Sequence, residues 1–335
     1  MIGGEFQIAI TDVLNAESRP SGAFDVYEYS SGRAALYQIL KYLKLEKGIN
    51  NVLLPDYLCG SVLVPVKSLE LEYAFYPIDD QLELEQLSFS KLYKPNSVVL
   101  LINYFGLKDL SCQVKAIRSI DENAIIIEDD VQAYYEFKKP LEGVDFKFTS
   151  LRKTFSVPDG GLVMTKQQLP MIDKPNMFGQ YKAAAAILKS MREGNFNDDI
   201  YLEMFEKGES LIDGELECGM SRIAEKLYSN LDEERLKVRR LNNARYLVEQ
   251  LAVMNVKPIL PLLENHVPLF VPVLLNDRNK VRKAMFQHEI FCPVHWPLEG
   301  LELKRGKEMA EHELSLIIDQ RYGQGDMDEI IQIFE

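Results

Sequence analysis

The sequence predicts an α/β protein: a large domain with a mostly parallel sheet and helices on both faces, followed by a smaller α+β domain. Strand-like and helix-like segments alternate through residues 30–165, as in chains that form parallel sheets. The runs at 98–102 and 124–128 are almost wholly apolar, which is typical of strands covered on both faces. A charged, helical stretch at 170–245 separates these segments from a second region of strands and helices.

Three parts are expected along the 335 residues, a length sufficient for two domains that share one large core. Residues 1–25 contain Pro20, Gly22 and several acids, and they are expected to form an N-terminal arm. The large domain is expected at 26–230. A long helix that begins near its end then leads into the small domain at 231–335.

The order of elements follows from local periodicity. The first helix is expected after Ser31, because apolar side chains recur at three- and four-residue spacing as far as Leu43. Ser30 or Ser31 is its candidate N-cap, and Gly48 ends it. Further strands are expected at 52–55, 71–77, 98–102, 124–128, 145–149 and 162–164, with helices at 61–69 and 112–120. In the small domain, strands at 268–275 and 289–294 flank a helix at 278–288.

The composition argues against several classes of protein. The chain has 51 acidic and 38 basic residues and a net charge of −13, whereas a nucleic-acid partner favours a basic face. No apolar run approaches the roughly 20 residues of a membrane span. The first residues lack a secretory pattern, so a cytoplasmic location with free thiols is expected. The four cysteines and four histidines lack metal-ligand spacing, so no metal site is expected.

A lysine and an aspartate stand at the predicted carboxyl ends of strands, where ligands bind in such sheets. Lys153 follows the strand at 145–149 and precedes the pair Gly160 and Gly161. Asp129 ends the apolar run 124–128. These are the two fixed points that pyridoxal phosphate (PLP) chemistry needs, because a lysine amine forms the Schiff base and an acid keeps the pyridinium nitrogen protonated.

Each of these two interpretations has an alternative. Most lysines are solvated, so Lys153 could be an ordinary loop residue, although Arg152 beside it is expected to depress its pKa. Glu128 and Asp130 compete with Asp129, because one step along a strand moves a side chain to the opposite face. A strand-end acid also commonly caps the following turn.

The start of the first helix is a candidate phosphate site. Gly32 lets the backbone approach an anion, and the first-turn N–H groups and the helix dipole favour negative charge. Arg33 adds a guanidinium, and Ser150 could add a hydroxyl. The alternative is a helix cap followed by a surface arginine, since short glycine motifs are weak signals.

Several segments together resemble the DegT/StrS-type sugar aminotransferases, which are PLP-dependent enzymes of fold type I. The resemblance covers residues 28–165 most clearly, and the acid–glutamine element followed by the lysine and the glycine pair is its most specific part. The segments that carry it are residues 31–36, 55–57, 103–106 and 127–133, together with Lys153 and residues 159–161.

The resemblance implies a role for each matching residue. Lys153 would be the Schiff-base lysine, Asp129 the pyridinium partner, and Gln132 a neighbour of the cofactor's 3-oxygen. The phosphate cradle would comprise Gly32, Arg33, Ala34 and Ser150. The implied reaction moves an amino group from a donor such as glutamate to a keto-sugar, including nucleotide-linked ones. Family members are usually homodimers that share their active sites.

The chain departs from the family pattern at the cofactor site. Arg33 replaces the usual threonine, so the phosphate site is expected to be rebuilt around a guanidinium. Cys59 stands where an aromatic residue usually stacks on the cofactor ring. Tyr57 and Tyr104 are alternative stacking residues, and the Cys59 sulfur is a third candidate for that face.

The small domain adds three candidate substrate residues. His295 and Trp296 lie on a proline-bounded turn, which is either a wall of the substrate site or a packed turn. Arg321 suits a substrate carboxylate, or is an exposed arginine after a helix.

Two other functions stay open: another PLP enzyme, such as an amino-acid transaminase or lyase, and a non-catalytic PLP-fold binding protein. A nicotinamide-dependent dehydrogenase is disfavoured because no GxGxxG follows an early strand.

Overall fold

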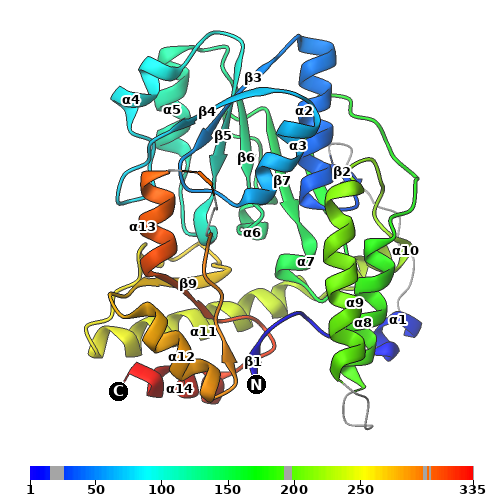
Figure 1. The fold of residues 1–335 in the computed structure, drawn as a ribbon, viewed down its shortest axis with the longest axis vertical. Helices are drawn as coiled ribbons and strands as arrows, with labels where there is room; N and C mark the ends of the chain where they lie inside the picture. Colours follow the sequence, from blue (N-terminus) through cyan, green and yellow to red (C-terminus); the bar gives the residue numbers. More distant parts are fainter. Residues whose placement is uncertain (16–25, 192–197, 297–299, 302, 335) are drawn as a thin grey trace.

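The computed structural model describes residues 1–15, 26–191, 198–296, 300–301 and 303–334. A large sheet with helices around it forms one end of the molecule, and a smaller group of helices and short strands forms the other (Figure 1). Among the described helices, none has both the length and the apolar character needed to cross a bilayer.

The central sheet has seven strands. Their spatial order is β2 (Val26–Tyr29), β8 (Gly161–Thr165), β7 (Phe146–Ser150), β6 (Ile125–Asp129), β5 (Ser97–Ile102), β3 (Asn51–Pro55) and β4 (Glu72–Tyr76). The ladders from β7 to β4 are parallel, and β8 runs antiparallel to both of its neighbours. Every residue of β5 and β7 is buried, so both faces of the sheet are covered, as expected for a mostly parallel sheet. The predicted fold class is confirmed.

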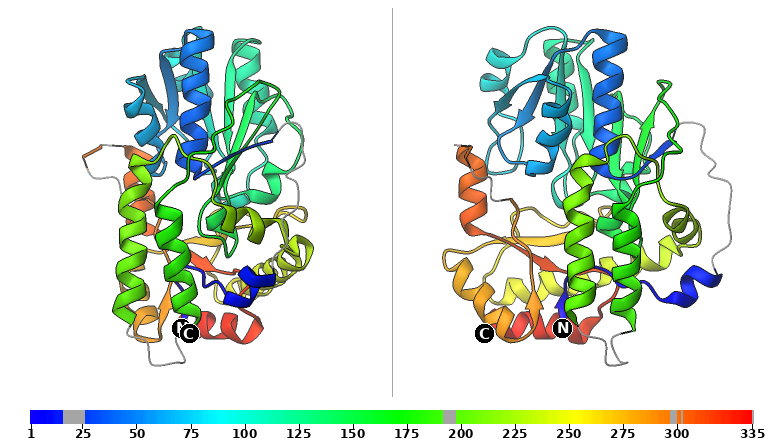
Figure 2. Two further views of the ribbon diagram at one scale, coloured as in Figure 1. Left: turned by 90° about the vertical axis from the view of Figure 1, so that its right-hand side faces the viewer. Right: turned by 45° about the vertical axis from the view of Figure 1, so that its right-hand side comes forward.

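Helices of the large domain follow the strands or extend beside the sheet. They are α2 (Gly32–Lys47), α3 (Leu63–Ser68), α4 (Gln86–Leu92), α5 (Ser111–Ile120), α6 (Tyr134–Phe137), α7 (Leu151–Thr154), α8 (Phe178–Ser190), α9 (Asp198–Leu211) and α10 (Arg222–Ser229), with the short 3-10 helices Gly60–Val62, Tyr104–Gly106 and Ile212–Gly214. The helices α8 and α9 lie side by side and extend toward the small domain (Figure 2).

The small domain begins with the long helix α11 (Glu233–Val253). It continues through β9 (Phe270–Leu274), α12 (Arg278–Gln287), β10 (Ile290–Phe291), α13 (Lys304–His312), β11 (Glu313–Ile317), α14 (Gln324–Ile331) and the 3-10 helix Gln332–Phe334. Strand β11 pairs antiparallel with β9. A separate apolar core lies between these elements, which include buried Leu247, Val273, Met285, Leu316 and Ile330.

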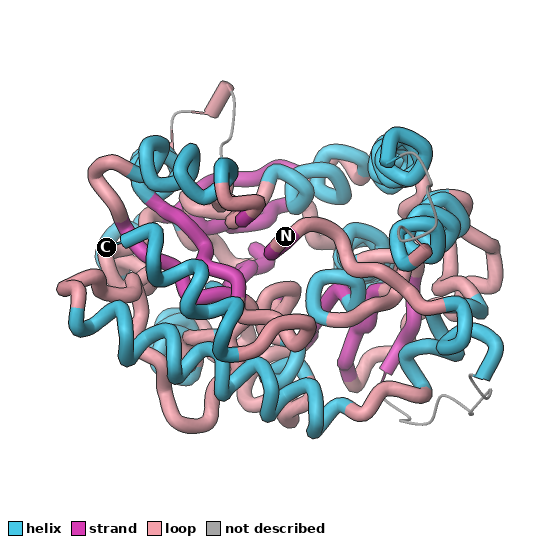
Figure 3. The backbone as a smooth tube through the Cα atoms, turned by 90° about the horizontal axis from the view of Figure 1, so that it is seen from below, coloured by secondary structure: helices cyan, strands magenta, loops and turns pink. Residues whose placement is uncertain are grey.

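The first residues of the chain belong spatially to the small domain. Strand β1 (Ile2–Gly3) pairs in parallel with β10. From there the segment runs across the molecule to helix α1 (Ile10–Asn15), as Figure 3 shows from the small-domain side. The rest of the expected arm, residues 16–25, lies outside the described residues.

Most expected elements of the large domain are present within a few residues of their predicted ends. Three strands were missed, namely the two-residue β1, β2 at the sheet edge and β11 in the small domain, and the strand expected at 289–294 is only the two-residue β10. Strand β2 is mostly half-buried, so its periodicity is weak, and its conformation is fixed by pairing with β8.

Candidate active site

The predicted cofactor residues meet at one cavity of about 210 Å³. It lies at the carboxyl ends of β6 and β7, next to the start of α2, and residues from the small domain close it. Of the predicted site residues, those that line it are Gly32, Arg33, Cys59, Asp129, Gln132, Ser150, Lys153, His295 and Trp296.

The glycine pair brings the lysine loop against the start of α2. A Cβ on Gly161 would lie 2.1 Å from the Ser31 carbonyl oxygen, so only glycine fits this contact. Gly160 has a φ of +113°, its N–H donates to the Ser30 carbonyl at 2.7 Å, and its carbonyl accepts the Leu151 N–H at 3.0 Å. The sequence motif therefore has a structural reason: it closes the turn that presents Lys153 beside the helix start.

Lys153 presents its amine to the cavity. Its side chain is exposed to the cavity, and it makes no hydrogen bond or ion pair within the described part of the chain. Although the side chain faces open space in the cavity, the protein atoms around it partly desolvate the amine and lower its pKa, and the charge of Arg152 lowers the pKa further, while Cys59 and more distant acids oppose this. A lowered lysine pKa makes more of the unprotonated, nucleophilic amine available near neutral pH.

Asp129 provides a buried carboxyl in the same cavity. Its Oδ1 accepts the Val131 N–H at 2.9 Å, while Oδ2 accepts no hydrogen bond from the described residues. Burial raises the Asp129 pKa to about 7, although the Val131 hydrogen bond partly opposes this rise, and Glu128 adds to it. A buried carboxyl without a cationic partner suits a ligand that brings its own positive charge, such as a protonated ring nitrogen.

The two acids that compete with Asp129 lie elsewhere. Lys147 Nζ lies 3.3 Å from a carboxylate oxygen of Glu128 and 4.0 Å from one of Asp130, in a buried cluster outside the cavity. Burial and the nearby Glu128 raise the Asp130 pKa, and Lys147 only partly offsets them. The alternation of side chains along β6 explains why Asp129 alone of the three lines the cavity.

The helix start has the features of an anion site. Ser31 caps α2 because its hydroxyl oxygen accepts the Ala34 N–H at 3.1 Å, so this N–H is not available to an anion. Ala34 itself is buried. Gly32 brings the backbone close to Ser150, and a Cβ at Gly32 would lie 3.3 Å from the Ser150 Cβ. Ser150 makes no side-chain cap on α7. Helix N–H groups, the Ser150 hydroxyl and a guanidinium are the donors that a phosphate needs.

Acids hold the two arginines of this corner in place. Arg33 lies 3.1 Å from Asp213 and 3.4 Å from Glu209, and Arg152 also lies 3.4 Å from Glu209. Burial opposes ionisation of Glu209, but the charges of Arg152, Lys182 and Arg33 outweigh it and lower its pKa to about 2. Glu209 is therefore a permanent anion that orients both guanidinium groups at the cavity.

We expect Arg33→Ala to raise the dissociation constant of PLP about tenfold, because one charge-assisted hydrogen bond to the phosphate is lost. Fluorescence titration of the cofactor-free protein measures this change. Arg222→Ala, which removes an exposed arginine, is the matched control. Equal affinities for the two variants would show that Arg33 does not bind the phosphate.

The two tyrosines considered for ring stacking do not line the cavity. Their rings stack on each other, with centroids 5.4 Å apart and planes 14° apart, and both are buried. The Tyr104 hydroxyl donates to the Tyr57 carbonyl at 2.6 Å, and the Tyr57 hydroxyl donates to the His295 carbonyl at 2.9 Å. The ring of Trp296 lies 5.0 Å from that of Tyr57, so the tyrosine pair supports the tryptophan in the cavity wall.

Cys59 and Gln132, in contrast to the two tyrosines, line the cavity. The Cys59 sulfur accepts a hydrogen bond from the Ser61 hydroxyl at 3.1 Å. The Gln132 Oε1 accepts the Phe105 N–H at 2.9 Å, which leaves its amide N–H groups as donors. A donor in the cavity suits the oxygen that the family resemblance assigns to Gln132.

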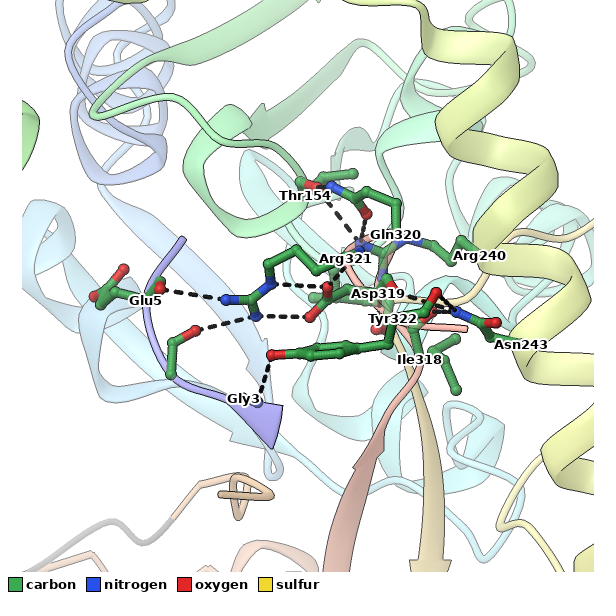
Figure 4. Close-up of polar contacts among 12 residues, drawn as sticks. Gly3, Glu5, Thr154, Arg240, Asn243, Ile318, Asp319, Gln320, Arg321 and Tyr322 are labelled. Atoms are coloured by element: carbon green, nitrogen blue, oxygen red, sulfur yellow. Dashed lines mark hydrogen bonds and ion pairs between the residues drawn. The ribbon is translucent and has the colours of Figure 1, made fainter. Parts of the chain in front are cut away.

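Arg321 does not line the cavity; its guanidinium instead contacts Asp319 and the N-terminal segment (Figure 4). Its guanidinium pairs with Asp319 through Nε–Oδ1 at 2.9 Å and Nη2–Oδ2 at 2.7 Å, and it donates to the carbonyls of Gly4 and Glu5 at 3.1 and 3.3 Å. It also lies 4.3 Å from the centre of the Phe6 ring. These contacts attach the N-terminal segment to the small domain.

We expect Arg321→Ala to lower the free energy of unfolding by about 2 kcal/mol, because partly buried charged hydrogen bonds to Asp319 and the N-terminal segment are lost. Urea unfolding measures this loss. Arg245→Ala, on the exposed side of α11, is the control and should change stability by less than about 0.5 kcal/mol. If Arg321→Ala is as stable as the control, these contacts contribute nothing.

Sequence patterns missed part of the cavity wall. Leu269, Phe270 and Pro293 come from the small domain, and Ile212 follows α9. None of these apolar residues differs locally from an ordinary core residue. Only the packing of the small domain against the large one brings them to Lys153.

The arrangement of sheet, lysine loop and small domain defines a fold that is shared with solved aminotransferase structures. The putative sugar aminotransferase Spr1654 from Streptococcus pneumoniae, in its PLP form, is 15% identical with a TM-score of 0.72, over 99% of this chain and 97% of that chain. The aminotransferase TlmJ from Streptoalloteichus hindustanus is 16% identical with a TM-score of 0.69, over 99% and 97% of the two chains. At such identities the likeness establishes the fold.

A third structure, the sugar aminotransferase CalS13 from Micromonospora echinospora, is 15% identical with a TM-score of 0.68, and 99% of each chain is covered. A NifS-like protein also matches, with 14% identity and a TM-score of 0.56 over 93% of this chain and 81% of that chain. No protein-family model and no curated protein matches the chain.

Proposed function

We propose that this protein is a PLP-dependent aminotransferase of the DegT/StrS type. The observation that carries the proposal is the placement of Lys153 and Asp129 in one cavity, next to a helix start with two guanidinium groups. A reactive amine, a buried acid and an anion cradle match the aldehyde, the ring nitrogen and the phosphate of PLP. Resemblance in the sequence and likeness to sugar aminotransferase structures support the same choice.

Each residue has a defined task in this proposal. When bound, PLP supplies an aldehyde that reacts with amines and a ring that takes up an electron pair. Lys153 Nζ would hold the cofactor, and as a free amine it would take the proton from the donor's Cα. Asp129 would keep the ring nitrogen protonated through its carboxylate. The start of α2, Arg33 and Ser150 would hold the phosphate and fix the orientation of the ring.

The proposed substrates are an amino acid donor such as glutamate and a keto-sugar acceptor, including nucleotide-linked ones. The resemblance to sugar aminotransferases supports this choice. A homodimer with shared sites and a cytoplasmic location also stay predictions, which sedimentation and cell fractionation would test.

A half-reaction with glutamate tests the proposed function. Glutamate is added to the PLP-loaded protein without an acceptor, and absorbance and 2-oxoglutarate are followed. A transaminase gives about one 2-oxoglutarate per site and converts the cofactor to its amine form. A lyase would instead turn over continuously with the cofactor unchanged, and a non-catalytic binding protein would do neither. Either result, repeated with several amino acids, would overturn the proposal.

A further inference from the structure

A chain of polar side chains backs His295 in the cavity wall. The His295 Nδ1 lies 2.9 Å from the Ser315 Oγ, and the Ser315 hydroxyl donates to Glu313 Oε1 at 2.5 Å. The second carboxylate oxygen, Glu313 Oε2, accepts the His295 backbone N–H at 2.6 Å. Glu313 and Ser315 are fully buried on β11, whereas His295 lines the cavity.

The directions of these hydrogen bonds fix the protonation of the neutral imidazole. The Ser315 hydroxyl has a single proton, and it is given to Glu313. Ser315 can therefore only accept from His295, so Nδ1 carries the hydrogen. When the ring is neutral, the other nitrogen, Nε2, then has a free lone pair, and none of the described residues donates to it; the Glu313 Oε1 lies 3.8 Å from Nδ1, on the Nδ1 side of the ring.

Aromatic neighbours hold the ring in this orientation. The His295 ring centre lies 5.8 Å from that of Phe105, 5.2 Å from that of Phe270 and 5.2 Å from that of Trp296. Three rings around one imidazole restrict its rotation. The orientation of His295 therefore depends on packing as well as on Ser315.

A purely structural role poorly explains the hydrogen-bonded series of His295, Ser315 and Glu313. All five residues of β11 are buried, and an apolar residue at position 313 would pack without a desolvation cost. A buried carboxylate costs several kcal/mol unless its oxygens are satisfied. Both Glu313 oxygens are used on His295 and on the serine that contacts it, which is the pattern of a group that orients a histidine.

We propose that Glu313 and Ser315 are positioning residues that hold His295 as the Nδ1–H tautomer, so that its Nε2 accepts a hydrogen bond from a hydroxyl group of the acceptor. The lone pair of a neutral imidazole matches a neutral hydroxyl group on the ligand, whereas a positively charged group at this place would favour a ligand carboxylate. Trp296 beside it offers an aromatic face to the carbon skeleton of the same ligand. The inference rests on the proposed function, since it assigns the acceptor class to that site.

Histidine-selective 15N NMR of the PLP-loaded protein tests the tautomer without any assay of activity. The chain has only four histidines, His266, His288, His295 and His312, so the resonance is assigned with His295→Asn. We expect Nδ1–H in the unaltered protein and a change toward Nε2–H in Ser315→Ala. The matched control is Ser90→Ala at an exposed site on α4, which should change nothing. An Nε2–H tautomer in the unaltered protein overturns the proposal, even if Ser315→Ala fails to fold.

Kinetics test the contact with the acceptor. With a UDP-linked 4-keto-hexose as the probe, Ser315→Ala is expected to raise the acceptor KM about tenfold, as for one lost hydrogen bond. The glutamate half-reaction should stay within about twofold. An unchanged acceptor KM, despite a changed tautomer, overturns the contact with the hydroxyl. If the unaltered protein shows no half-reaction with glutamate, the proposed function is contradicted instead. The tautomer measurement needs no activity, so it distinguishes failure of this inference from failure of the proposed function.

Discussion

Replacement of Lys153 with alanine is expected to abolish covalent retention of PLP and to lower transamination by about 10⁴-fold, because the nucleophile and the proton-transfer base are lost together. Borohydride reduction followed by mass spectrometry measures the first effect. In the unaltered protein, the added mass should map to the peptide that contains Lys153. The half-reaction with glutamate measures the second effect.

The structure offers a matched control for this variant. Lys166 is an exposed lysine just after β8, and Lys166→Ala should leave both the covalent attachment and the rate unchanged. The anion cradle is intact in Lys153→Ala, so PLP should still bind reversibly. If borohydride fixes PLP to Lys153→Ala as well as to the control, Lys153 is an ordinary residue and the proposed function loses its main support.

Replacement of Asp129 with asparagine is the second large effect. We expect a fall in the rate of the half-reaction of about 10³-fold, since a neutral amide cannot keep the ring nitrogen protonated, and preorganised charges at active sites commonly contribute this much. Stopped-flow absorbance with glutamate measures the rate. Comparison of this variant with Asp130→Asn also shows which of the two neighbouring acids acts on the cofactor, a choice that the local sequence leaves open.

Asp130→Asn is the informative companion to this variant. Asp130 lies outside the cavity, and burial raises its pKa so that its carboxyl is readily protonated, which makes asparagine a near-isosteric replacement. Its half-reaction should stay within about threefold of the unaltered protein. Equal losses in Asp129→Asn and Asp130→Asn would mean that the substitutions act through the sheet and not through the cofactor.

The pH dependence of stability gives Asp129 a second readout. Its ordinary pKa of 3.8 rises to about 7 in the cofactor-free folded protein, so the folded state binds an extra proton between these values. Stability from this group is therefore present at low pH and lost as pH rises toward 7. Relative to Asp129→Asn, the unaltered protein should lose stability between about pH 4 and pH 7 in urea unfolding, with little further loss from this group above that window. A pH-independent difference would contradict the raised pKa.

The sequence by itself determined the architecture of the large domain and two points of the candidate site. Continuous apolar runs such as 98–102 are legible because burial on both faces leaves no polar positions. Asp129 stands out because it is an acid at the end of such a run, and Lys153 because it follows the next strand closely and precedes a glycine pair; the ends of these strands meet at one edge of the parallel sheet. These features depend on neighbours along the chain.

The tertiary structure alone decided which side chains reach the cavity. Asp129 rather than Asp130 lines it because of the phase of one strand, and Arg321 attaches the N-terminal segment because β1 pairs with a strand almost 290 residues later. Tyr57 lies behind Trp296, and Glu313 reaches His295, through contacts between distant segments. Such contacts depend on how the small domain packs on the large one, and local periodicity contains no information about that packing.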